Sequence, residues 1–246
     1  MAVDEKAEGV KVEEILSIKN LCKSFRKHKV LTSINLSVKK GEIYGVVGNN
    51  GAGKTTLFKI LCGLLPASGG TVEFSPALTQ NGVGTLIENA GLFKDMNAFE
   101  NLKAKALCLG KKYTDAQIDE LIRLVGLESA GKKNVLRYSM GMKQRLGIAL
   151  ALIGDPELLI LDEPLNNLDP QGIAEVRNLL IRLNKERGIT VILSSHILEE
   201  LVKTATQFCI LNDGEFVKQY STEQLLAECG DRPIDEYYIE IVSGAH

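Results

Sequence analysis

The sequence predicts an α/β fold in which a parallel β-sheet is buried on both faces. Three short stretches, residues 43–47, 158–161 and 190–193, are apolar with little interruption. Such runs are typical of parallel strands covered on both sides, because a strand with one face in water alternates with polar residues. Helical patterns separate the three runs, so we expect a layered sheet with right-handed crossover connections.

The chain before and after the first run predicts a different kind of strand. Ile34, Leu36 and Val38 alternate with polar residues, and residues 15–25 and 72–74 are compatible with β-structure. A two-residue alternation indicates a strand with one face in the core and the other in water. We therefore expect half-exposed strands in the first part of the chain.

The middle of the chain, residues 89–153, is dominated by helical patterns. Thr114 and Gln117 have the spacing of a capping box, in which each side chain bonds the backbone N–H of the other residue. An apolar helical face follows this pair in the sequence. The pattern predicts a helical lobe inserted into the sheet.

Helix and turn signals also mark the last third of the chain. Asp169 followed by Pro170 favours the start of a helix, and Gly188 is placed to end it. Residues 212–214 are Asn-Asp-Gly between two apolar runs, which predicts a β-hairpin.

The C-terminal stretch, residues 221–246, has no function that the sequence reveals. Ser221 and Gln224 have capping-box spacing, which predicts a helix. Three residues then alternate in the manner of a strand: Tyr237, Ile239 and Ile241.

The length of 246 residues is large for one core and small for two, so we expect one domain with two lobes. The expected organisation is an N-terminal extension (1–14), a domain (15–220) whose helical lobe spans about 89–153, and the C-terminal segment (221–246). The extension lacks the apolar core of a signal peptide, and no apolar run approaches the roughly 18 residues that cross a bilayer. We expect a soluble chain, so any membrane-spanning helices belong to another protein.

The charge balance argues against a nucleic-acid partner, and the cysteine spacing argues against a disulfide framework and a zinc site. With 29 basic and 31 acidic residues the net charge is −2, which predicts no nucleic-acid partner. The densest basic stretch, residues 26–29, lies between two alternating runs and is expected to be a solvated turn. Five scattered cysteines without a CxxC pair fit neither a disulfide framework nor a zinc site, and they suit a reducing cytosol.

A phosphate-binding loop is the most specific signal in the sequence. Residues 48–55 match the pattern GxxxxGK[ST] as Gly48-Asn49-Asn50-Gly51-Ala52-Gly53-Lys54-Thr55. An apolar strand precedes this loop and a helix follows it, which is the context that the pattern requires. By chance the pattern arises in about one chain of this size in a hundred. The flanking elements therefore favour nucleotide binding over a glycine-rich turn.

Each part of this loop has a chemical task. Glycines let the backbone N–H groups point inward, and the start of the following helix adds partial positive charge where phosphates bind. Lys54 is the candidate for the β and γ phosphates, and the Thr55 hydroxyl is the candidate ligand for Mg²⁺. Thr56 is placed to contact the α phosphate.

Two carboxylates, Asp162 and Glu163, directly follow the apolar run 158–161. Ligand sites in open α/β sheets lie at the carboxyl ends of such strands. We expect Asp162 to hold Mg²⁺, directly or through water, and Glu163 to orient and deprotonate the attacking water. Without the phosphate loop, an acidic turn at a strand end would be the better interpretation.

Residues 138–145 resemble the signature motif of the ATP-binding cassette (ABC) ATPases, L-S-G-G-Q followed by Q-R. The sequence here is Y-S-M-G-M-K-Q-R, in which four positions match: Ser139, Gly141, Gln144 and Arg145. Tyr138, Met140 and Met142 depart from the usual form. A serine hydroxyl and a glycine N–H at a helix start suit a γ-phosphate. Standing alone, the stretch would be interpreted as an N-capped core helix.

Other residues resemble further motifs of the same family in the same order along the chain. Asp169 ends a stretch similar to the D-loop, and His196 follows the third apolar run like the switch histidine. Phe25 lies where the family stacks an aromatic ring on adenine. In isolation, the histidine and the phenylalanine would each be interpreted as structural.

Glu88 is the main departure from the family. Where its members usually carry a Mg²⁺-sensing glutamine that links the two lobes, residues 83–89 read V-G-T-L-I-E-N. This acidic replacement, with the variant signature, resembles the branch that handles bacitracin and lantibiotic-type peptide antibiotics.

The resemblance implies a P-loop NTPase core with an antiparallel β subdomain and an inserted helical subdomain, the ABC ATPase fold. It implies ATP and Mg²⁺ as cofactors, with Lys54, Glu163 and His196 in catalysis and Thr55, Glu88 and Asp162 at the metal. Two such subunits face head to tail, so a second identical or related ABC ATPase subunit and a transmembrane permease are the expected partners. The expected location is the cytoplasm, peripherally on the inner face of the cell membrane.

Three alternatives remain at this stage. A small-molecule P-loop kinase need not carry the signature, the strand-end glutamate and the switch histidine in this order. A soluble ABC ATPase of a non-transport assembly machine would share every motif. An ATP-binding regulatory module without hydrolysis is disfavoured because Glu163 and His196 are both present.

Overall fold

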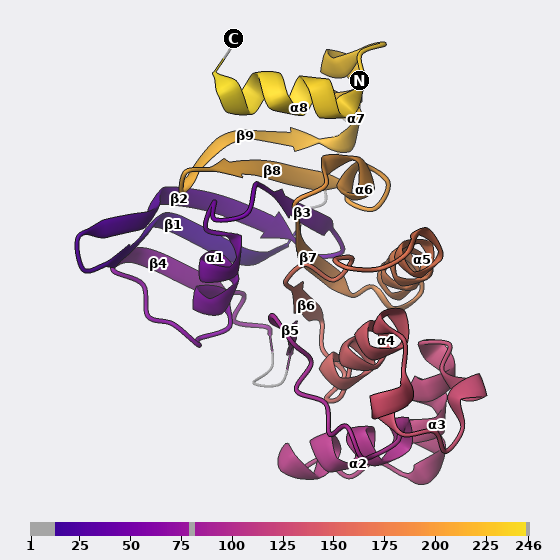
Figure 1. Ribbon diagram of the computed structural model, residues 1–246. Helices are drawn as coiled ribbons and strands as arrows, with labels where there is room; N and C mark the ends of the chain where they lie inside the picture. Colours follow the sequence, from indigo (N-terminus) through magenta and orange to yellow (C-terminus); the bar gives the residue numbers. More distant parts are fainter. Residues whose placement is uncertain (1–12, 79–81, 245–246) are drawn as a thin grey trace, which may run out of the picture.

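The computed structural model describes residues 13–78 and 82–244, which form two β-sheets (Figure 1). The larger sheet has the order β5-β6-β7-β3-β8-β9, and its neighbours are parallel except for β8 and β9. Its strands are β3 (Ile43–Val47), β5 (Val83–Leu86), β6 (Leu158–Leu161), β7 (Thr190–Ser195), β8 (Gln207–Asn212) and β9 (Glu215–Ser221). The smaller sheet is antiparallel in the order β2-β1-β4, from β1 (Glu14–Phe25), β2 (His28–Lys39) and β4 (Gly69–Phe74).

The three apolar runs are strands buried on both faces, as predicted. In β3, Tyr44 and Val46 pack in one core, whereas Ile43 and Val47 pack in the other. The first core lies between the large sheet, the antiparallel sheet and α1 (Lys54–Leu61). The second lies between the large sheet and helices that include α4 (Met140–Ala151) and α5 (Pro170–Arg187). Because both faces are covered, most positions of these strands carry apolar side chains.

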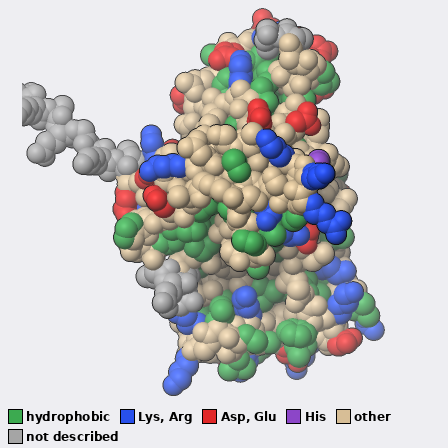
Figure 2. Space-filling model, turned by 90° about the vertical axis from the view of Figure 1, so that its left-hand side faces the viewer, with side chains coloured by type: hydrophobic (Ala, Val, Ile, Leu, Met, Phe, Trp, Pro, Cys, Tyr) green, Lys and Arg blue, Asp and Glu red, His purple; other side chains and the backbone are tan. Residues whose placement is uncertain are grey.

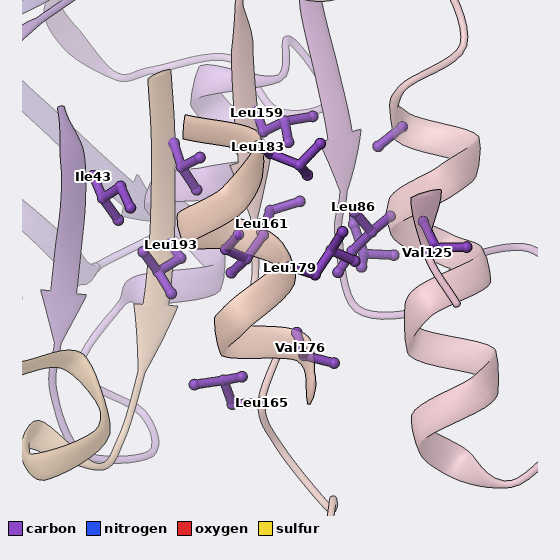
Figure 3. Close-up of a cluster of buried hydrophobic side chains, with 14 of the residues drawn as sticks. Ile43, Leu86, Val125, Leu159, Leu161, Leu165, Val176, Leu179, Leu183 and Leu193 are labelled. Carbon is purple, nitrogen blue, oxygen red and sulfur yellow. The ribbon is translucent and has the colours of Figure 1, made fainter. Parts of the chain in front are cut away.

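Helix α5 supplies much of the second core, which Figure 3 shows. The sheet contributes Leu159, Leu161 and Leu193, and α5 contributes Val176, Leu179 and Leu183. The helix begins at Asp169, whose Oδ1 accepts a hydrogen bond from the Gly172 N–H at 2.9 Å, and ends at Gly188 with φ 66°. Both predicted ends are confirmed. Full burial of each leucine side chain stabilises the fold by about 1.5–3 kcal/mol.

The middle of the chain is helical, with α2 (Ala98–Cys108), α3 (Asp115–Leu124) and the 3₁₀ turns Glu128–Ala130 and Val135–Arg137 before α4. The predicted capping box of Thr114 and Gln117 is present, and Asn97 with Glu100 forms a second one at α2. The Arg145 guanidinium of α4 donates to the carbonyl oxygens of residues 125 and 126. These bonds fasten the end of α3 to α4.

The C-terminal segment corrects one prediction. Ser221 caps α7 (Thr222–Cys229) as expected, but residues 237–241 lie in α8 (Ile234–Ser243) and not in a strand. Tyr237 and Ile241 are buried, whereas Ile239 between them is 63% exposed. Two residues four positions apart share a face in a helix as well as in a strand. Three alternating apolar residues therefore do not distinguish a helix from a strand.

The structure also tests the expectations for the hairpin, the cysteines and membrane-spanning helices. The hairpin of β8 and β9 turns at Asp213 and Gly214, both with positive φ as a tight hairpin requires. All five cysteines are free thiols, and burial raises the pKa of Cys62 to about 12. Within the described part of the chain, no helix has the length and hydrophobicity that a bilayer crossing demands.

The basic stretch and the N-terminus differ in detail from expectation. The turn covers Arg26 and Lys27 only, and His28 already belongs to β2. The predicted extension 1–14 lies outside the described residues up to residue 12, and Glu14 is the first residue of β1.

Tyr237 fixes the C-terminal helices through a polar cluster in which the two tyrosines are buried and Glu228 and Lys218 are exposed. Its hydroxyl donates to the Glu228 carboxylate at 2.7 Å and lies 3.0 Å from the hydroxyl of Tyr220. The Lys218 ammonium also reaches Glu228, at 3.2 Å. Hydrogen bonds from Tyr237 and Lys218 lower the pKa of the Glu228 carboxyl. The cluster thus joins β9, α7 and α8.

Replacing Tyr237 by phenylalanine removes these hydrogen bonds without emptying the core. We expect a loss of about 1–2 kcal/mol in the free energy of unfolding, because the Tyr220 hydroxyl loses a buried partner. The matched control is Tyr238→Phe, whose hydroxyl has one long hydrogen bond, 3.4 Å to Asn49. Urea unfolding of both variants measures the difference, and equal midpoints would contradict the role of the cluster.

Candidate functional site

The predicted phosphate-binding loop lies between β3 and α1. Gly51 and Gly53 have φ of 90° and 109°, which side chains with a Cβ rarely adopt. A Cβ on Gly48 would lie 2.4 Å from the carbonyl oxygen of Leu211, so the loop also needs glycine for close packing against β8. The glycines of the motif therefore have a structural reason as well as a predicted chemical one.

The Lys54 side chain is buried inside this loop. Its ammonium donates to the carbonyl oxygens of Gly48 at 2.6 Å and Asn49 at 3.2 Å, and it lies 3.1 Å from the Glu163 carboxylate. With only 5% of the residue exposed, the charge is shielded from water and its partners hold it in one position. The loop thus presents the Lys54 ammonium at a cavity that Gly51 and Gly53 also line.

Asp162 is the most constrained carboxylate of the site. It is 5% exposed and accepts hydrogen bonds from the Thr55 hydroxyl at 2.8 Å and the Ser194 hydroxyl at 2.7 Å. The Ser194 oxygen in turn accepts from the Glu163 N–H at 2.7 Å. Asp162 therefore joins α1 to the ends of β6 and β7.

Ser194 is a site residue that the sequence analysis did not assign. It belongs to the Ser194-Ser195-His196 run, in which only the histidine received a role. The parallel pairing of Leu161 with Leu193 was the missing information, because it brings Ser194 beside Asp162.

The Glu163 carboxylate bridges two cationic or proton-bearing groups. One oxygen faces the Lys54 ammonium, and the other lies 2.9 Å from Nδ1 of His196. An ionised carboxylate only accepts hydrogen bonds, so Nδ1 carries the proton in this contact. Glu163 itself has φ 49°, a strained value for a residue with a side chain. The structure brings together the three residues predicted to act in catalysis.

A cavity of about 880 Å³ opens beside these groups, a size that ligand sites commonly have. Its lining includes the phosphate loop, the two carboxylates and the start of α4: Val30, Asn50, Gly51, Gly53, Lys54, Thr55, Thr56, Glu88, Met140, Lys143, Gln144, Asp162, Glu163, Asn166 and Asn167. Lys94 and Lys143 add cations from the middle part of the chain that the sequence analysis did not assign. Positive charge on several sides suits a polyanionic ligand.

The same groups suit Mg²⁺ that arrives with a nucleotide. Mg²⁺ prefers oxygen ligands and usually binds through one or two carboxylates plus phosphates and water. Asp162 and Thr55 offer a carboxylate and a hydroxyl within hydrogen-bond distance of each other. No cluster of three or more His, Cys, Asp or Glu among residues 13–78 and 82–244 provides a complete metal site by itself.

Eight predicted site residues do not line the cavity: Phe25, Gly48, Asn49, Ala52, Ser139, Gly141, Asp169 and His196. Ser139 caps α4 through a hydrogen bond from the Met142 N–H at 3.2 Å, and Gly141 lies in the first turn of that helix. Asp169 caps α5. Phe25 is 47% exposed, with the Lys23 ammonium 4.9 Å from its ring centre.

Glu88 lines the cavity, but its carboxylate is paired with a lysine of α1 and not with the groups around Asp162. Its carboxylate forms an ion pair with Lys59 of α1 at 2.8 Å.

The comparisons with known proteins agree with this site. Residues 31–166 match the family described as ABC transporter. The chain is 41% identical over 218 residues to the bacitracin transport ATP-binding protein BcrA of Bacillus licheniformis, covering 86% of this chain and 71% of that protein. It is 40% identical over 220 residues to the lantibiotic transport ATP-binding protein SrtF of Streptococcus pyogenes, covering 87% and 95%.

Among solved structures, cbiO1 from Clostridium perfringens, part of the ABC transporter complex cbiONQ, is similar with a TM-score of 0.78. That match has 27% sequence identity and covers 88% of this chain and 92% of cbiO1. These similarities favour a transporter ATPase over a small-molecule kinase, a non-transport assembly ATPase or a regulatory module. The chain belongs to the ABC transporter family, in which it is an ATP-binding subunit that hydrolyses ATP to drive transport.

Proposed function

We propose that this subunit powers a separate transmembrane permease that exports peptide antibiotics of the bacitracin or lantibiotic type, or confers resistance to them. The observation that carries the proposal is the identity of 41% to BcrA and 40% to SrtF over most of the chain. The subunit would act in the cytoplasm, bound peripherally to the inner face of the cell membrane. The permease would supply the membrane-spanning helices.

The proposed chemistry assigns a role to each group of the cavity. Lys54 and the loop N–H groups bind the β and γ phosphates of ATP, and Thr55 and Asp162 hold Mg²⁺. When bound, Mg²⁺ offsets the charge that develops on the phosphates. Ser194 fixes the orientation of Asp162 through its 2.7 Å hydrogen bond. Phe25 stacks on the adenine, and Thr56 contacts the α phosphate.

Glu163 acts as the general base in this proposal. Its Oε1 lies 3.1 Å from the Lys54 ammonium as an ion pair, without a hydrogen bond from any described residue, and its Oε2 lies 2.9 Å from His196 Nδ1. When the Lys54 ammonium turns to the phosphates, one oxygen becomes free to accept a proton from the attacking water. The hydrogen bond to His196 Nδ1 keeps the carboxylate oriented during this exchange. His196 then contacts the γ-phosphate through its other ring nitrogen.

A second ABC ATPase subunit, identical or related, completes each ATP site. Ser139 is exposed and Gly141 partly exposed, and neither lines the cavity of its own chain. Their position at the start of α4 suits them to bind a phosphate held by a facing subunit. Two chains related by a two-fold axis would form two equivalent sites, in which Asp169 also lies near the interface.

Replacing Glu163 by glutamine tests the catalytic and dimer proposals together. We expect turnover to fall by about 10²- to 10⁴-fold with ATP still bound, because the amide keeps the shape but is not a base. A dimer should then accumulate in Mg-ATP, as measured by size-exclusion chromatography with light scattering.

The matched control is Glu157→Gln, at the opposite end of β6, where Glu157 pairs with Lys40 at 2.7 Å. This variant should hydrolyse ATP like the wild type. A Glu163→Gln protein that hydrolyses ATP normally would exclude the general-base assignment, and one that stays monomeric at all ATP concentrations would exclude the shared site.

The permease is proposed to contact a groove beside the helical lobe. The groove has a volume of about 350 Å³ and is lined by residues that include Leu64, Ile87, Phe93 and Leu150. Leu64 and Phe93 are 65% and 54% exposed, so the groove offers apolar surface to a partner. Figure 2 shows hydrophobic side chains at the surface above and below the narrowing between the sheets and the lower, helical part. A short helix from the permease would cover this apolar lining.

Phe93→Ser should weaken capture of the permease, because a hydroxyl replaces the largest apolar contact of the groove. We expect at least a tenfold loss of the polytopic protein that co-purifies from native membranes, a fold-change typical of interface aromatics. Ile239→Ser, at a site on α8 that is 63% exposed, is the control that keeps normal capture. Equal recovery with both variants, each with a wild-type thermal midpoint, would place the permease elsewhere.

A further inference from the structure

We propose that Lys59 is a positioning residue that holds Glu88 away from the metal site until Mg²⁺ and nucleotide bind. This inference builds on the proposed function of the phosphate-loop cavity and adds a residue that the family motifs do not include. We call the ion pair of Lys59 and Glu88 the charge latch.

The charge latch joins two elements that are distant in the sequence. Lys59 lies on α1 one turn after Thr55, and its ammonium is 2.8 Å from a Glu88 oxygen. Glu88 follows β5 in a tight turn with φ 57°, where the Asn89 N–H donates to the Ile87 carbonyl oxygen at 2.6 Å. The ion pair therefore ties the helix after the phosphate loop to the segment that leads towards α2.

Glu88 has the position of a third carboxylate at the cavity. Leu86 of β5 pairs with Leu161 of β6, so Glu88 lies two residues beyond its strand just as Glu163 does. Both side chains line the cavity together with Thr55 and Asp162, whereas Lys59 does not line it. Lys59 holds the Glu88 carboxylate from outside the cavity.

The three carboxylates have different partners, and Glu88 is the one that can most easily exchange its partner for a metal ion. Asp162 is buried and bonded to two hydroxyls, and Glu163 is paired with Lys54 and His196. The side chains of Glu88 and Lys59 are 56% and 34% exposed, so their ion pair is weak and open to competition. A divalent cation in the cavity attracts the same carboxylate that the ammonium holds, and Glu88 cannot serve both fully.

The exchange has a structural consequence. Release of Glu88 from Lys59 frees the segment after β5 from α1, and that segment leads to Phe93 and to the capped start of α2 at Asn97. Binding of metal and nucleotide would thereby change the constraint on the helical lobe. A glutamine at residue 88 carries no charge, so Lys59 would hold it less strongly.

A four-protein comparison tests the latch: wild type, Lys59→Met, Glu88→Gln and the double variant. The probe is adenylyl imidodiphosphate, a non-hydrolysable ATP analogue, titrated by calorimetry with excess Mg²⁺ and with EDTA. The ratio of the two dissociation constants is the gain in affinity that the metal provides. We expect Lys59→Met to raise this ratio about two- to fivefold in the wild-type background, the range of an exposed ion pair. In the Glu88→Gln background it should leave the ratio unchanged.

Two further variants control this measurement. Lys40→Met removes a lysine from the 2.7 Å ion pair at the other end of the sheet, and it should leave the ratio at the wild-type value. The exchanged pair K59E/E88K keeps opposite charges but turns a cation towards the cavity, so the ratio should fall below that of the wild type.

The outcomes separate the latch from simple charge effects. An unchanged ratio in Lys59→Met, or the same rise in both backgrounds, would overturn the proposal, since a general effect of positive charge does not depend on residue 88. Failure of the wild type to bind the analogue would instead contradict the proposed function of the cavity.

Discussion

The buried carboxylate of Asp162 is the interaction on which the site depends. Its two oxygens accept hydrogen bonds from Thr55 and Ser194, so one side chain joins the helix after the phosphate loop to two neighbouring strands. A buried carboxylate is tolerated only with such partners. The carboxylate that is proposed to bind the metal therefore also fixes the helix after the phosphate loop relative to Ser194, which in turn bonds the backbone of Glu163.

The charges around Asp162 are arranged in pairs that nucleotide binding would exchange. Lys54 and His196 share Glu163, and Lys59 holds Glu88. Each of these contacts satisfies a charged group that is also proposed to meet phosphate, water or metal. In a partly buried site such partners reduce the penalty of an unpaired charge. The ion pairs keep these side chains in position, and each pair can be replaced when phosphate, water or metal binds.

Sequence patterns predicted the parallel strands, the phosphate loop and the order of the motifs, because those features depend on local periodicity and backbone conformation. Features that depend on register were not predicted. Ser194 reaches Asp162 only through the pairing of β6 with β7, and Lys59 meets Glu88 across 29 residues. The helix α8 was mistaken for a strand because Tyr237 and Ile241 share a face in either structure. Local pattern therefore identified the chemistry, and tertiary contacts determined its partners.

The positions of Ser139 and Gly141 connect the fold to the proposed assembly. A site completed within one chain would bring the start of α4 over its own phosphate loop, yet only Met140, Lys143 and Gln144 of that helix reach the cavity. The predicted phosphate-binding atoms of the signature remain on the surface. Moving them onto their own loop would require displacing α4 from its packing in the core. In the proposed pair, a facing subunit would supply the same atoms without that rearrangement, so the packing that fixes α4 is consistent with a site shared between two subunits.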